Sequence, residues 1–164
     1  MYNDEKEKVT RDDVLSLDIA THCGFYSVYE AGTWDLTKYK RTSNGDMTCT
    51  KFDEILTDFI KKHNIKRIVA EDVSCGRAAY QFIATRKLSE FRGVLRDVCG
   101  RLGLPEPAFV NPKTVKNWAT GNGNADKKMM MEYCIKRWGI DPHGDDNMAD
   151  ATHIWKYYVR VCDL

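Results

Sequence analysis

Three acidic residues lie in or beside apolar stretches of the sequence, where a carboxylate is unfavourable unless it has a partner or a function. Asp18 lies within the apolar stretch Val14–Ala20, and Glu71 ends the apolar run that begins at Arg67. Asp150 lies in the stretch "GDDNMADATHIW", residues 144–155. Because burying an unpaired charge is costly, each acid needs either a salt bridge or a shared cation.

The acidic stretch around Asp150 also has a simpler interpretation. Asp and Asn are preferred at helix starts, where they cap backbone N–H groups and complement the helix dipole, so one or two of Asp145, Asp146 and Asn147 need no other role. If the helix starts near Asp146, Asp150 lies one turn later, on the same face as Asp146 and Asn147. Asp150 is therefore the acid of this stretch that we expect to face a site.

A divalent cation would satisfy such acids together. Hard oxygen ligands select Mg²⁺ or Mn²⁺. Two such ions about 4 Å apart can activate a water molecule and stabilise the leaving oxygen of a phosphodiester. The sequence thus predicts that Asp18, Glu71 and Asp150 meet in a metal site for phosphodiester hydrolysis, with separate salt bridges as the alternative.

The elements that would position these acids follow from the apolar spacing. Three adjacent strands are predicted at Val14–Ala20, Phe25–Ala31 and Thr33–Tyr39, joined by turns at Gly24 and Gly32. Their order with the later elements predicts an α/β fold with a mixed five-stranded sheet, whose first strand is central and lies beside the strand ending at Glu71. The later elements are a helix at Lys51–His63, a strand at Arg67–Glu71, a long amphipathic helix over 76–103, a strand at Ala108–Val110, two helices flanking 121–124 and a final helix.

Charge is distributed unevenly along a chain whose net charge is only +1. Residues 76–103 contain six bases and two acids, and residues 113–137 contain six bases and two acids. Helix faces exposed to solvent would explain this pattern. The more specific alternative is that these bases contact the phosphate groups of a nucleic acid.

The overall numbers describe a single domain. At 164 residues we expect a charged, frayed leader over 1–13 and one domain over 14–164. The six cysteines form no C-x-x-C pair, which disfavours a zinc site and a disulfide framework. No apolar run approaches the roughly 18 residues that span a membrane, and no signal peptide is present, so a cytoplasmic or nucleoid location is expected.

Four segments in sequence resemble the RuvC family of Holliday-junction resolvases, and its phage and viral branch in particular. They are "VLSLDIATHCGFYSV", "RIVAEDV", "VKNWATGNGNADKKMM" and "DDNMADATHIW". The resemblance implies an RNase H-like fold and a homodimer built through the helix over 76–103. It also implies an endonuclease that uses Mg²⁺ or Mn²⁺, two ions per site, to nick two strands of branched DNA symmetrically, leaving 5′-phosphates.

The resemblance also assigns residues. Asp18, Glu71 and Asp150 match the family's acids, and Lys116 and Lys127 fall where the family has bases near the scissile phosphate. The predicted catalytic residues are Asp18, Glu71, Asn147, Asp150 and Lys127, and the predicted metal ligands are Asp18, Glu71, Asp146, Asn147 and Asp150. DNA contacts are expected from Lys113, Lys116, Lys127, Lys128, Arg77 and Tyr80.

Two departures from the family pattern leave alternatives open. The family's other helix ligand stands three residues before the last acid, where this chain has Asn147, and Asp146 could substitute for it. Bacterial members place an aromatic residue shortly after the acid that matches Glu71, and here Tyr80 comes only later. A nuclease acting on RNA–DNA hybrids or flaps, or a non-catalytic junction-binding protein, is therefore the alternative function. His153 either packs within its helix or reaches a phosphate or metal.

Overall fold

The computed structural model describes residues 8–72 and 79–164 and contains a five-stranded mixed sheet. β1 pairs antiparallel with β2, and β2 with β3, whereas β4 runs parallel to both β1 and β5. The predicted arrangement, with the first strand central and the strand ending at Glu71 beside it, is confirmed. In spatial order the strands are β3 (Ala31–Asp35), β2 (His22–Tyr26), β1 (Val14–Asp18), β4 (Arg67–Glu71) and β5 (Ala108–Val110).

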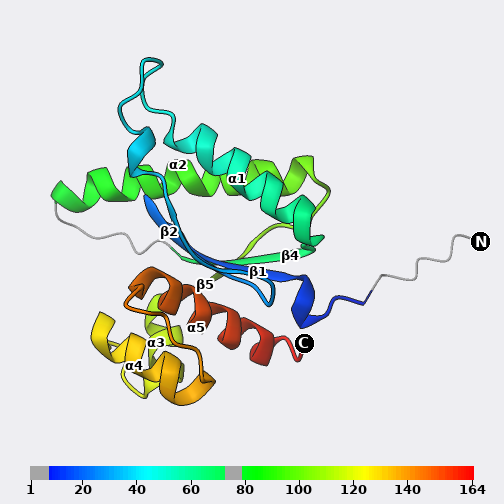
Figure 1. The fold of residues 1–164 in the computed structure, drawn as a ribbon, viewed down its shortest axis with the longest axis vertical. Coiled ribbons are helices and arrows are strands. Elements are labelled where there is room, and N and C mark those ends of the chain that lie inside the picture. The colour runs from blue at the N-terminus through cyan, green and yellow to red at the C-terminus, as the bar shows by residue number, and fades with distance from the viewer. Residues whose placement is uncertain (1–7, 73–78) are drawn as a thin grey trace, which may run out of the picture.

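Helices cover both faces of the sheet (Figure 1). One face carries α1 (Thr48–His63) and α2 (Ala79–Arg101), and the other carries α3 (Pro112–Thr120), α4 (Lys127–Trp138) and α5 (Asp146–Val161). Two 3-10 turns, η1 (Arg11–Asp13) and η2 (Thr37–Tyr39), flank the first three strands. Within the described residues, no helix has the length and apolar character that crossing a membrane requires.

Alternation along β1 decides which side chain faces which layer. Leu15 and Leu17 are fully buried in the core shared with α1 and α2. Val14 packs instead with Ile154 and Trp155 of α5. Since successive side chains of a strand point to opposite faces, Asp18 belongs to the α5 side of the sheet.

The predicted bounds of β2 and β3 were wrong. Both strands begin earlier than expected, and Gly24 and Gly32 lie inside strands rather than in turns. The connection between β2 and β3 is formed by residues 27–30, where Ser27 N donates to Glu30 O at 2.9 Å. Gly24 was misread because its lack of a side chain serves a close contact with α5, described below, and not a turn.

The predicted leader is also shorter than expected. Thr10 caps η1, with its backbone N and its hydroxyl donating to Asp13 Oδ2 at 2.7 and 2.9 Å. Lys66 N donates to Asp13 O at 2.9 Å, which ties this turn to the start of β4. Residues 10–13 are therefore folded, because the capping box satisfies the polar groups that a frayed end would leave to water.

One side of α2 packs within the chain. Phe91, Leu95 and Val98 are fully buried within the chain's own core, and the Phe91 ring lies edge-on to that of Phe52 of α1 at 5.3 Å. These residues are therefore not available for a contact with a second copy, and the homodimer through this helix stays a prediction. Any dimer contact of α2 must use its outward face.

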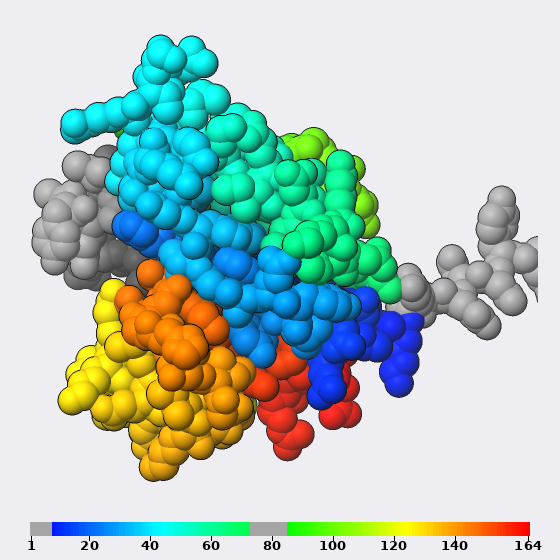
Figure 2. All heavy atoms as spheres, in the orientation of Figure 1, coloured from blue at the N-terminus to red at the C-terminus, as the bar shows by residue number. Residues whose placement is uncertain are grey.

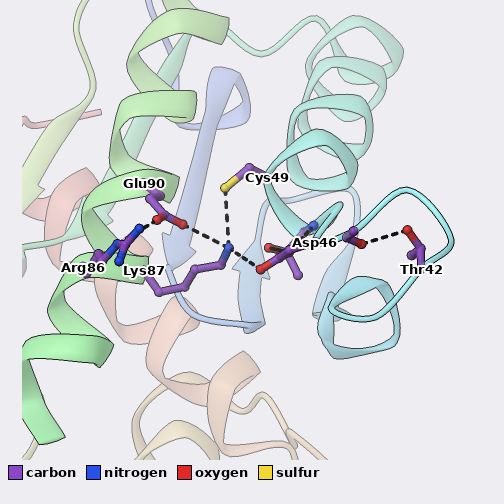
Figure 3. A network of polar contacts seen from close by, with 8 residues as sticks. Thr42, Asp46, Cys49, Arg86, Lys87 and Glu90 are labelled. Atoms are coloured by element: carbon purple, nitrogen blue, oxygen red, sulfur yellow. Dashed lines mark hydrogen bonds and ion pairs between the residues drawn. The ribbon is translucent and has the colours of Figure 1, made fainter.

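A polar network fixes α2 to the start of α1 (Figure 3). Lys87 Nζ lies 3.1 Å from Asp46 Oδ2, 3.1 Å from Glu90 Oε2 and 3.9 Å from Cys49 Sγ. Asp46 in turn accepts hydrogen bonds from the N–H and the hydroxyl of Thr48, which lower its pKa to about 2 together with Lys87. The charged carboxylate thus serves both the first turn of α1 and the adjacent helix.

Candidate active site

Asp18 and Glu71 come together because two parallel strands end side by side. The β1–β4 register pairs Leu15 with Ile68 and Leu17 with Ala70. Asp18 and Glu71 directly follow the last of these pairs at the carboxyl ends of their strands. Both side chains alternate with residues of the α1–α2 core, so they share the α5 side of the sheet.

The start of α5 shows which of its acids is a cap. Asp145 is the N-cap, and its Oδ1 accepts hydrogen bonds from Met148 N at 3.0 Å and from the Thr33 hydroxyl of β3 at 2.8 Å. The capping interpretation is thus correct for Asp145. Asp146 and Asp150, one turn apart in the helix, are left for another role.

Three contacts hold α5 on the sheet. The Gly24 backbone lies so close to the first turn of α5 that a Cβ atom there would stand 2.1 Å from the Asn147 carbonyl oxygen. The buried Ser16 hydroxyl donates to Ala151 O at 2.7 Å, and Trp155 Nε1 donates to Val14 O at 3.1 Å. In the space-filling view the orange segment leading into α5 lies directly against the blue strands (Figure 2).

Burial and mutual repulsion raise the pKa values of the clustered acids. Desolvation, followed by the charges of Glu71, Asp150 and Asp146, raises the pKa of Asp18 well above its ordinary value. Desolvation and the charge of Asp150 raise the pKa of Glu71 to about 7. Desolvation raises the pKa of Asp150 to about 6, although Lys116 opposes the rise. The four acids therefore lie within electrostatic reach of one another.

Two of the predicted bases face this acidic cluster. Lys127, at the start of α4, forms an ion pair with Asp146 and also lowers the pKa values of Asp18 and Asp150. Lys116 of α3 lowers the pKa values of Glu71 and Asp150. Lysine ammonium groups on this side would attract a phosphate group to the acids.

The other predicted DNA contacts are placed differently. Lys113 and Lys128 are exposed, and Lys128 lies 3.9 Å from Glu132 of its own helix. Arg77 lies outside the described residues, as does the side chain of Tyr80. The structure therefore does not test either of these two predicted contacts.

The chemistry of the acids fits a hard divalent cation. Asp150 Oδ1 is buried and has no hydrogen-bond partner in the described part of the chain, which leaves a carboxylate oxygen in need of a positive or proton-donating group. No three His, Cys, Asp or Glu side chains among the described residues already stand at metal-binding distance. Mg²⁺ is usually held by one or two carboxylates together with water and substrate phosphate oxygens, so it does not need three protein ligands.

Asp146 and Asn147 occupy different positions relative to the other acids. The charge of Asp146 reaches both Asp18 and Asp150. Asn147 lies with its backbone against Gly24, and its side chain makes no hydrogen bond with the residues described. The two alternatives for the helix ligand thus differ in their observed interactions with the cluster.

His153 is a packing residue. It is fully buried, its Nδ1 accepts from Trp138 Nε1 at 3.0 Å, and its Nε2 donates to Met130 O at 2.8 Å. Both ring nitrogens are therefore occupied by protein groups. Desolvation lowers its pKa, which keeps the ring neutral between α4 and α5.

Two residues that shape the site escaped prediction. Ser16 could have been noticed, because it is a second polar residue in the otherwise apolar "VLSLD". Gly24 carried a misleading signal, since glycine between two strand-like runs is typical of a turn. Their roles depend on α5, which lies more than a hundred residues away in the chain.

Comparisons with known proteins agree with this architecture. No protein-family model and no curated protein matches the sequence. Among solved structures, Thermus thermophilus RuvC is similar with a TM-score of 0.64 and 13% identity, over 91% of this chain and 96% of that one. T. thermophilus RuvC in complex with a Holliday junction substrate gives a TM-score of 0.67 and 16% identity, over 91% and 95%. The yeast mitochondrial Holliday junction resolvase Ydc2 is similar with a TM-score of 0.51 and 14% identity, over 97% of this chain and 86% of that one.

The fold is therefore RNase H-like, as in RuvC, and the resemblance noted in the sequence is confirmed for the fold.

Proposed function

We propose that this chain is a divalent-metal-dependent endonuclease that cuts branched DNA, with four-way junctions as its substrate. The observation that carries the proposal is a cluster of acids on a RuvC-like fold, with an unpartnered buried oxygen on Asp150. The pKa values of Asp18, Glu71 and Asp150 are raised, and the charge of Asp146 reaches two of them. Structural similarity to RuvC bound to a Holliday junction favours this substrate over hybrids or flaps.

Each residue of the cluster has a role in the proposed reaction. Asp18 and Asp150 would hold one Mg²⁺ or Mn²⁺ ion, and Glu71 with Asp146 would hold a second or orient the first. Such ions, when bound, lower the pKa of a water molecule and polarise the phosphodiester. Asn147 is the ligand expected from the family pattern, and in this proposal it remains the alternative to Asp146.

The lysines would act on the phosphate. Lys116 and Lys127 approach the acids from α3 and α4, so a phosphate held above the cluster would lie between carboxylate-bound cations and ammonium groups. Charge that develops on the phosphate oxygens in the transition state would be neutralised most directly by Lys127. Exposed Lys113 and Lys128 would contact flanking backbone, and Arg77 and Tyr80 remain predicted contacts.

Paired nicking, which would leave 5′-phosphates, requires two such sites, and we include a homodimer in the proposal. The outward face of α2 carries Gly93 and Gly100, where an added Cβ atom would meet nothing within 4 Å in the described structure. Two glycines one heptad apart let a second helix approach closely. Light scattering of the purified protein measures the mass and tests this part.

The test is a cleavage assay with a labelled synthetic four-way junction and a matched linear duplex, in Mg²⁺, Mn²⁺ or EDTA. We expect symmetric nicks in the junction alone, abolished by EDTA, and an Asp18→Asn variant that binds the junction without cutting it. Equal cleavage of an RNA–DNA hybrid would instead support the hybrid nuclease. Binding without cleavage in either metal would support a non-catalytic junction-binding protein.

A further inference from the structure

A pocket opens beside Asp18 and Glu71 on the side of the sheet edge that faces α2. Its lining includes both acids, Asp72, which follows Glu71, Phe109 of β5 and Arg92 of α2. Among the described residues that line it, Arg92 is the one cation. The pocket thus places a guanidinium group next to the proposed catalytic acids from a direction opposite to that of Lys116 and Lys127.

The Arg92 side chain is held in place from two sides. Its guanidinium carbon lies 3.7 Å from the centroid of the Phe109 ring, and its Nη1 donates to Asp72 Oδ1 at 2.5 Å. Asp72 is itself fixed, because its N–H donates to Val110 O at 2.8 Å and prolongs the pairing of β4 with β5. The Arg92 side chain is therefore already ordered. A ligand that binds it would lose less free energy to the ordering of this side chain.

The arginine retains capacity for a ligand. A guanidinium has five N–H donors in a planar fork, and the hydrogen bond to Asp72 uses Nη1 alone. The side chain is still 27% exposed. A carboxylate and a phosphate present similar pairs of oxygens to an arginine, so a phosphate oxygen can share or replace the contact that Asp72 makes.

We propose that Arg92 binds a DNA phosphate that flanks the scissile one, and so positions the cleaved strand over the acids from the α2 side. This inference rests on the proposed function, because it takes the substrate to be DNA. In this arrangement the strand lies between Arg92 on one side and the lysines of α3 and α4 on the other. Arg92 is a positioning residue, whereas the reacting phosphate would be bound by the acidic cluster and the lysines.

Arg96 supplies a matched control. It lies one helical turn after Arg92, its guanidinium carbon stands 5.5 Å from the same Phe109 ring, and it pairs with Glu106 at 2.7 Å. It does not line the pocket. Arg92→Gln and Arg96→Gln therefore remove the same charge from the same helix beside the same ring, and only Arg92→Gln alters the pocket.

The experiment measures the affinity of the protein for a four-way junction at several salt concentrations. The buffer contains Ca²⁺ in place of Mg²⁺ or Mn²⁺, so that binding is measured without the two ions proposed to support cleavage. We expect Arg92→Gln to weaken binding about tenfold near 0.1 M salt and to reduce the slope of log K against log salt by about 0.9, the value for one phosphate contact. Arg96→Gln should change neither by as much, and Arg92→Lys should restore the slope but only part of the affinity.

Thermal unfolding and light scattering of each variant exclude losses due to stability or mass. Equal affinities and slopes for the Arg92→Gln and Arg96→Gln variants would overturn the inference and leave Arg92 a structural link between α2 and β4. Should Arg92→Gln fail to fold, the affinity deficit of Arg92→Lys decides the same question. Failure of the unmodified protein to bind any junction would overturn the proposed function itself, and this inference with it.

Discussion

Removing one charge from the acidic cluster should make the folded protein more stable, because the clustered carboxylates repel one another. Glu71 is the best position to test, because its pKa is raised from 4.5 to about 7 by burial and by Asp150. At about 1.4 kcal/mol for each pH unit, this difference corresponds to about 3 kcal/mol of stability lost when the carboxyl is ionised. Glu71→Gln mimics the protonated form, so it should raise the free energy of unfolding by up to about 3 kcal/mol at pH 8.

The sign of the pH dependence follows from linkage. Below about pH 4.5 the carboxyl is protonated in both the folded and the unfolded chain, so Glu71→Gln and the wild type should be nearly equal in stability. Between pH 4.5 and 7 the unfolded chain loses the proton first, and the wild type becomes progressively less stable than the variant. Above pH 7 the difference is constant.

Urea unfolding in EDTA at pH 5 and pH 8, followed by circular dichroism, measures this difference. Glu132→Gln, on the exposed face of α4, is the control and should change stability by less than about 0.5 kcal/mol. Adding Mn²⁺ at pH 8 should stabilise the wild type more than the variant, because the cation relieves the same repulsion. Equal stabilities of wild type and Glu71→Gln at pH 8 would refute a repulsive cluster.

Three further predictions concern the parts that build the site. Gly24→Ala should cost about 3 kcal/mol in thermal unfolding, because its Cβ would stand 2.1 Å from Asn147 O, and an unchanged melting temperature would contradict this. Asp146→Asn should weaken Mn²⁺ binding by about tenfold in calorimetric titration and Asn147→Ala should not; the reverse would make Asn147 the ligand. Burial lowers the pKa of His153, so His153→Gln should lose less stability than the wild type when the pH falls from 7 to 5, and parallel losses would contradict this.

Local pattern was sufficient for part of the fold and for the acids. The bounds of β4 and β5 agree with prediction because each is a short apolar run with clear polar limits. That Asp18 and Glu71 lie close together could be predicted, because a charge inside an apolar strand conflicts with its neighbours. Such conflicts are visible without knowledge of the fold.

The rest depended on contacts between distant segments. Gly24 was assigned to a turn because no local signal distinguishes a turn glycine from one that lies under a helix. The segment over 76–103 could be predicted as an amphipathic helix, but only the position of α1 shows what covers its apolar side. Arg92 looked like any other base of its segment until β5 placed Phe109 beside it.

The docking of α5 also determines when a complete site can exist. Asp18 and Glu71 belong to strands that pair early in the chain, whereas Asp146 and Asp150 arrive on the last helix described. Contacts between residues so far apart form only after much of the chain is ordered. During synthesis, a chain that has not yet released α5 from the ribosome carries half of the acids and cannot attack DNA by the proposed route. The site that we propose would therefore be complete only after α5 has docked on the sheet.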